Sequence, residues 1–184
     1  MNFADGALLL CLDMQPVFLR AVANSGEVLR RCQFAVSAAR ELGIPVAFTE
    51  QVPQKLGATD PTLLSLAQAP TVHAKEAFSA HACLLPSRTT PGDNKGLGHL
   101  IICGVETPVC VFQTAVGALQ SGIPVTVLAD CVGARREADA RVCLDALARA
   151  GAQVLPAETV YYSILGGARH PSFRAYTELV KKYA

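Results

Sequence analysis

Short apolar runs alternate along the chain with longer stretches whose apolar residues recur at helical spacing. Segments 42–48 (LGIPVAF) and 121–127 (SGIPVTV) share one design, in which a glycine ends a helix and a strand follows. This alternation predicts a mainly parallel sheet with right-handed crossovers and helices on both faces. The expected strands are 7–12, 45–49, 71–75, 99–103, 124–129 and 153–155, and the expected helices are 27–42, 62–67, 108–121, 137–150 and 172–182.

The chain has 184 residues and no linker-like segment divides it, so we expect one domain over residues 1–184. The predicted fold is a single doubly wound α/β domain. Its sheet has about six mostly parallel strands in the order 3-2-1-4-5-6.

Composition argues against several classes of partner. The net charge is +1, and the sequence contains no run of basic residues. We therefore expect neither nucleic acid nor a membrane surface as a partner. The N-terminal segment has no basic region before its short apolar run, which favours a cytoplasmic protein over a secreted one. With 51% hydrophobic and 17% charged residues, we expect a homo-oligomer, with 108–121 and 161–165 as candidate contact surfaces.

Seven cysteines are present, an odd number, and none forms a CxxC pair. This usage is typical of buried thiols in a reducing compartment, and we assign no disulfide. The four histidines, at positions 73, 81, 99 and 170, lack the spacing of metal ligands. The sequence therefore predicts no metal and no cofactor.

The segment 99–116 (HLIICGVETPVCVFQTAV) predicts a buried strand, a tight turn and a helix. Thr107 is a suitable N-cap, and Pro108 suits the first helical position. Cys110 then lies in the first helical turn, where the helix dipole favours a thiolate and free N–H groups can bind an oxyanion. The alternative is that Cys110 is a small apolar residue in a buried turn.

Charged residues follow other expected strands. Asp13 ends the first strand, Lys75 the third and Asp130 the fifth. Ligands bind at the carboxyl ends of parallel strands, so Asp13 and Lys75 are candidate partners of Cys110. A carboxylate can take the thiol proton and an ammonium can stabilise a thiolate. Alternatively, Asp13 and Asp130 cap turns or helices and Lys75 is solvated.

Three motifs in order resemble the isochorismatase-like cysteine hydrolases: LLLCLDMQPVF at the start, AKEAFSA in the middle and ICGVETPVCVFQTA around the thiol. Segments 49–59 (TEQVPQKLGAT) and 163–173 (SILGGARHPSF) are similar to the isochorismatase domain-containing branch. The resemblance implies an Asp–Lys–Cys triad of Asp13, Lys75 and Cys110. It also implies a cis peptide bond between Val105 and Glu106, with the N–H groups of Glu106 and Cys110 directed at one substrate oxygen.

One departure concerns metal. Nicotinamidases of this family carry an Asp-x-His type cluster after the second strand, whereas residues 50–54 here are EQVPQ, without histidine. Zinc, iron and nicotinamide are therefore not expected. Members that cleave isochorismate need no thiol nucleophile, so Cys110 favours the amide-cleaving branch.

The sequence thus predicts a metal-independent cysteine hydrolase of a small amide, carbamoyl or related acyl substrate, acting through a thioester. The expected pocket residues are Phe18, Gln51, Phe78 and Thr107. Other thiol chemistry, on peroxides or aldehydes, is less favoured because no resolving CxxC partner is present. A binding or scaffold protein of the same fold is the other alternative.

Overall fold

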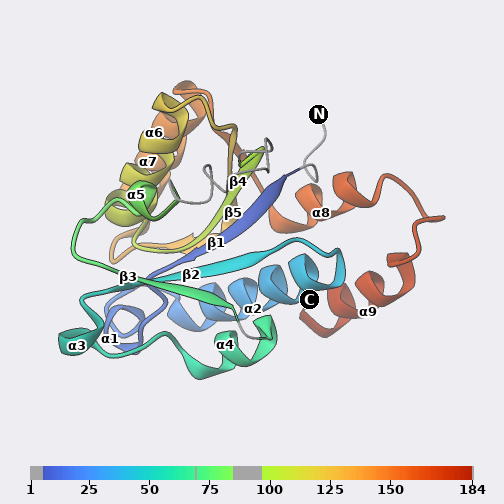
Figure 1. The fold of residues 1–184 in the computed structure, drawn as a ribbon, viewed down its shortest axis with the longest axis horizontal. Coiled ribbons are helices and arrows are strands. Elements are labelled where there is room, and N and C mark those ends of the chain that lie inside the picture. The colour runs from blue at the N-terminus through green and yellow to red at the C-terminus, as the bar shows by residue number, and fades with distance from the viewer. Residues whose placement is uncertain (1–5, 69, 85–96, 184) are drawn as a thin grey trace, which may run out of the picture.

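A computed structural model describes residues 6–68, 70–84 and 97–183. It contains one six-stranded parallel sheet in the order β3-β2-β1-β4-β5-β6 (Figure 1). The predicted fold class and strand order are confirmed. The strands are β1 (Ala7–Leu12), β2 (Val46–Gln51), β3 (Thr71–Lys75), β4 (His99–Val105), β5 (Val125–Gly133) and β6 (Gln153–Leu155).

Helices cover both faces of this sheet (Figure 1). One face carries α2 (Ser25–Glu41), α4 (Pro61–Ala67), α8 (Ala157–Leu165) and α9 (Phe173–Tyr183). The other carries α5 (His81–Leu84), α6 (Phe112–Gln120) and α7 (Glu137–Arg149). The short helices α1 (Pro16–Leu19) and α3 (Pro53–Leu56) follow the carboxyl ends of β1 and β2. Crossovers that place helices on both faces bury the central strands on both sides.

Two predicted boundaries are wrong at the carboxyl ends of the central strands. The expected strand 99–103 continues to Val105, and the expected strand 124–129 continues to Gly133. The register between β4 and β5 shifts between Ile102 and Gly104, after which Gly104 pairs with Val132. Asp130 and Gly104 interrupt the apolar runs of β5 and β4, so neither run marks the true end of its strand.

Helix α8 was not predicted as a helix, and its final residues were assigned to a contact surface. Tyr161 is fully buried and its hydroxyl donates to the Ala35 carbonyl at 2.8 Å. Its ring meets Phe34 edge to face, with the centroids 6.2 Å apart. Tyr161 and Leu165 are therefore core residues, whereas Tyr162 keeps 40% of its surface exposed.

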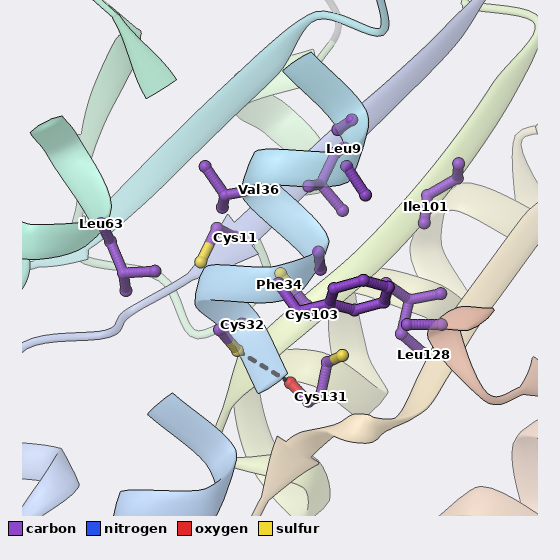
Figure 2. Packing of buried hydrophobic residues seen from close by; sticks show 14 of the residues in the cluster. Leu9, Cys11, Cys32, Phe34, Val36, Leu63, Ile101, Cys103, Leu128 and Cys131 are labelled. Carbon is purple, nitrogen blue, oxygen red and sulfur yellow. Dashed lines mark hydrogen bonds between the residues drawn. The ribbon is translucent and has the colours of Figure 1, made fainter. Parts of the chain in front are cut away.

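The apolar residues form a separate layer on each face. The layer beneath α2 includes Leu9, Cys11 and Ile101 of the strands and Phe34 of the helix itself, all labelled in Figure 2. The layer beneath α6 and α7 includes Leu10, Leu12, Ile102 and Val127. Successive strand residues alternate between these layers because side chains point to opposite faces.

The described part of the chain holds no helix long and apolar enough to cross a membrane.

Candidate functional site

Asp13, Lys75 and Cys110 lie together at the carboxyl edge of the sheet. The Lys75 Nζ is 2.7 Å from the Asp13 Oδ2 and 3.6 Å from the Cys110 Sγ. All three residues are buried, with 1%, 6% and 6% of their surfaces exposed. Since β3 is two strands from β1, or about 10 Å at ordinary strand spacing, the long lysine side chain spans the width of β2.

The Lys75 ammonium is held by several further acceptors. It donates to the Gln51 Oε1 at 2.5 Å, and to the carbonyls of Ala77 and Phe78 at 3.3 and 3.2 Å. Gln51 is fixed in turn, because its Nε2 donates to the Glu76 carbonyl at 2.6 Å. Buried polar groups need such partners, so this network holds the cation toward Asp13 and the thiol.

Two positioning residues were not identified from the sequence. The Thr49 hydroxyl donates to the Asp13 Oδ1 at 2.6 Å. Gln15 accepts from the Gln51 N–H at 2.7 Å and donates from its Nε2 to the Gln51 carbonyl at 3.1 Å. Both could have been found in the sequence as polar residues at or just after the end of a strand. Thr49 lies near the end of β2, and Gln15 is two residues beyond Asp13.

Cys110 lies in a π-helical turn, η2 (Thr107–Val111), that leads into α6. The Glu106 carbonyl accepts from the N–H groups of Val109 and Val111 at 3.0 and 3.2 Å. The prediction that Thr107 is the N-cap is wrong: Glu106 precedes the turn, and the Thr107 hydroxyl donates to the Gly133 carbonyl at 3.0 Å. Because β4 extends to Val105, Thr107 is already inside the turn and faces β5.

The helix dipole that favours a thiolate at Cys110 is outweighed by burial. Burial, together with the Asp13 charge, raises the pKa of Cys110 to about 12, although the Lys75 cation acts in the opposite direction. Desolvation disfavours the charged form of a thiol more than the nearby cation and the helix end favour it. Cys110 is therefore a neutral thiol near pH 7, and it needs a base to act as a nucleophile.

A cavity of about 210 Å³ opens over this group. The predicted residues Phe18, Gln51 and Phe78 line it, whereas Thr107 does not. The remaining lining residues are Asp13, Val105, Glu106, Val109, Cys110 and Arg135. Most of the lining residues that were not predicted are apolar or belong to the turn before the thiol, so the cavity suits a small molecule.

Arg135 was not a sequence candidate, since it lies in a loop without a motif. Its Nε is 2.9 Å from the Glu106 Oε2, and its side chain is 63% exposed. The Val105–Glu106 peptide bond, whose two residues also line the cavity, is cis. Arg135 therefore places one positive charge at the edge of a largely apolar cavity.

Asp130, in contrast, has a structural role. Its Oδ2 accepts from Arg31 at 2.6 Å, and its Oδ1 accepts from the Ala157 N–H at 2.8 Å, at the start of α8. Both carboxylate oxygens are engaged in joining α2 and α8 to β5, as the capping alternative predicted.

The raised pKa of Cys110 predicts a distinctive pH dependence of alkylation. The reactive fraction is the thiolate, so iodoacetamide labelling of Cys110 should rise about tenfold per pH unit from pH 7 to 10, without a plateau. Asp13→Asn removes a charge that raises this pKa and should speed the labelling. Peptide mass spectrometry measures each site separately, with Cys143 as the internal reference. A plateau below pH 9 at Cys110 would contradict the neutral thiol.

Comparisons with known proteins agree with this fold. The family model of the Isochorismatase domain matches residues 7–159. Isochorismatase domain-containing protein 1 of Salmo salar is 34% identical over 175 residues, which are 95% of this chain and 60% of that protein. Isochorismatase domain-containing protein 2 of Bos taurus is 34% identical over 176 residues, which are 95% of this chain and 82% of that protein.

Two solved structures extend the comparison. MAR1 ribonuclease from Caenorhabditis elegans superimposes with a TM-score of 0.88 and 30% identity, covering 97% of this chain and 91% of that one. YcaC from Escherichia coli, described as an octameric hydrolase of unknown specificity, gives a TM-score of 0.77 and 22% identity, covering 100% and 95% of the two chains. The matched domain and these relatives show that the chain belongs to the isochorismatase family, and its parallel sheet has the fold of the family's hydrolases.

Proposed function

We propose that the protein is a metal-independent cysteine hydrolase that cleaves a small amide, carbamoyl or related acyl substrate through a thioester on Cys110. The observation that carries the proposal is the contact of the Lys75 ammonium with both the Asp13 carboxylate and the Cys110 sulfur, at 2.7 and 3.6 Å. The base Asp13 and the nucleophile Cys110 line one small cavity, and the Lys75 cation contacts both of them.

The first half of the reaction forms the thioester. Asp13 takes the Cys110 proton as the sulfur attacks the carbonyl carbon, so no free thiolate accumulates. The N–H groups of Glu106 and Cys110 receive the oxyanion. The C–N bond then breaks, and the proton held on Asp13 passes to the leaving amine.

The second half regenerates the enzyme. Asp13 removes a proton from water, whose oxygen attacks the thioester carbonyl carbon. The C–S bond breaks, the acid leaves, and the Cys110 sulfur recovers a proton from Asp13. Lys75 keeps one position throughout, because its contacts with Gln51 and two carbonyls do not depend on the protonation of the thiol.

The size of the cavity favours a small-molecule substrate. Its volume is about 210 Å³, and Phe18, Phe78, Val105 and Val109 form apolar walls. Because of these apolar walls, we expect substrates with a compact apolar part next to the scissile carbonyl. Arg135 supplies a cation beside Glu106 at the same cavity.

Acid quenching after exposure to a mixture of small amides and carbamoyl compounds tests the proposal. Intact-protein and peptide mass spectrometry should find an acyl adduct on Cys110 in the wild type. Cys143→Ala, which removes a partly buried thiol on α7, is the matched control and should form the same adduct. Cys110→Ala and Asp13→Asn should form none. Ligand binding without any adduct or product would favour the binding-protein alternative.

The name of the Caenorhabditis elegans relative makes ribonuclease activity the second candidate. The cavity walls are mostly apolar, and the net charge of the chain is only +1, so we favour the small-amide substrate. Incubation with a mixed-sequence RNA distinguishes the two. If the wild type cleaves the RNA and both Cys110→Ala and Asp13→Asn do not, the proposed amide substrate is wrong and RNA is the substrate of this site.

Self-association is also expected. The chain is 51% hydrophobic, and Val142 and Tyr162 keep 66% and 40% of their surfaces exposed. Closed symmetric assemblies are the usual form of soluble oligomers. Light scattering at micromolar concentration should give a mass of two or more times 19.4 kDa, in whole multiples. A mass equal to that of one chain would refute the prediction.

A further inference from the structure

Three cysteine side chains that play no part in the proposed reaction meet beneath α2. Cys11 comes from β1, Cys32 from α2 and Cys103 from β4 (Figure 2). Their sulfur atoms all lie within 4.8 Å of one another, and all three residues are fully buried. The fold therefore holds three thiols around one point in its interior.

The topology of the sheet explains why they meet. Cys11 and Cys103 are register partners on neighbouring parallel strands, so their side chains point to the same face. Helix α2 packs on that face and contributes Cys32. Because the cysteines are far apart in the sequence, no motif marks them. The expectation of a metal-free protein rested on the spacing of residues in the sequence, which cannot reveal a cluster formed by residues this far apart.

We propose that Cys11, Cys32 and Cys103 form a three-coordinate site for a cuprous ion. For three atoms within 4.8 Å of one another, some point lies no more than about 2.8 Å from all of them, against about 2.3 Å for a zinc–thiolate bond. The sulfur atoms would have to move inward by up to about 0.5 Å to surround an ion, and the Cys32 thiol would give up its hydrogen bond to the Cys131 carbonyl at 3.1 Å. Each thiol that binds the metal releases its proton to solvent.

The surroundings of the cluster select the metal. Thiolates are soft ligands that favour Cu(I), zinc or iron–sulfur clusters. Structural zinc is almost always bound by four ligands, whereas the described residues bring three together here. Cys131 is the nearest further cysteine on this face, and its thiol donates to the Arg31 carbonyl at 3.3 Å. The packed neighbours Phe34, Ile101 and Leu128 enclose the cluster, so we expect no solvent molecule as a fourth ligand.

The position of the cluster also links it to the carboxyl edge of the sheet. Cys11 is two residues before Asp13, and Cys103 is three residues before Glu106. A bound ion would join β1, β4 and α2 directly behind the turns that carry these residues. It would thus be a structural ion, separate from the thiol at position 110.

The test uses the full chain with Cys83, Cys110 and Cys143 replaced by alanine, which leaves only the four cysteines beneath α2. The protein is unfolded in guanidinium with a reductant and refolded anaerobically with Cu(I) held by a competing chelator. We expect one copper per chain after gel filtration, with three sulfur neighbours by X-ray absorption. Zinc supplied in the same way should be lost to the chelator.

Matched variants in that background locate the ion. Cys103→Ala and Cys32→Ala should each lower copper affinity at least tenfold, whereas Cys131→Ala should keep it. Circular dichroism identifies the variants that fold. Either Cys103→Ala or Cys32→Ala, if it folds, is sufficient for the test. The proposal is overturned if the parent retains no copper, if copper is retained equally without Cys32 or Cys103, or if zinc binds with four ligands.

Discussion

Replacing Lys75 by methionine is expected to lower the free energy of unfolding by about 3–5 kcal/mol. The methionine keeps most of the side-chain volume but leaves the Asp13 carboxylate, 1% exposed, without its cation. Removing one partner of a buried ion pair costs more than the pair contributes, because the remaining charge is uncompensated. Urea unfolding followed by circular dichroism measures the loss. The same variant should abolish adduct formation at Cys110.

Lys181→Met is the matched control. Lys181 pairs with Glu178 at the same distance of 2.7 Å, but the two side chains are 72% and 63% exposed. An exposed pair contributes little, so we expect a loss below about 1 kcal/mol. Adding Asp13→Asn to Lys75→Met should recover part of the stability, because it removes the unpaired charge. Equal losses for Lys75→Met and Lys181→Met would contradict a buried ion pair.

Gly104→Ala is expected to destabilise the protein by more than about 4 kcal/mol or to prevent folding. A Cβ at this position would lie 2.1 Å from the Leu12 carbonyl oxygen and 2.6 Å from the Leu12 nitrogen. Both are backbone atoms of the neighbouring strand, so no side-chain movement relieves the clash. The φ of Gly104 is also +110°, which an alanine rarely adopts. Thermal and urea unfolding measure the effect.

The control for this prediction is Gly26→Ala in α2. A Cβ there meets nothing within 4 Å, and alanine favours a helix over glycine. We expect unchanged or slightly increased stability. Normal stability of Gly104→Ala would show that β1 and β4 are farther apart at this point than the structure has them.

The sequence predicted the elements whose signal is local. Strands β1, β3 and β6 begin and end where the apolar runs indicated, and the glycine after α2 marks its end. The extension of β5 was missed because it depends on a register shift against β4, which is a property of the pair of strands. Helix α8 was missed because its apolar residues were assigned to an external surface instead of the layer beneath α2.

For the candidate site, the sequence supplied the charged residues but not their electrostatics. Asp13, Lys75 and Cys110 were found because each follows a strand of one parallel sheet. The direction of the Cys110 pKa shift could not be predicted, because burial, its largest cause, is known only in three dimensions. The contacts of Thr49 and Gln15, and the meeting of three cysteines, likewise arise from strand register and helix packing.

The location of Lys75 on the edge strand has a consequence for heat inactivation. Among the described strands β3 pairs with β2 alone, and Thr71, Val72 and Ala74 are exposed. Edge segments with few buried contacts open at a lower free energy than the core. Opening of β3 would withdraw the ammonium from Asp13 while both apolar layers stay intact. The protein should therefore lose function on warming before it melts, and hydrogen exchange at β3 should be faster than at β1 and β4.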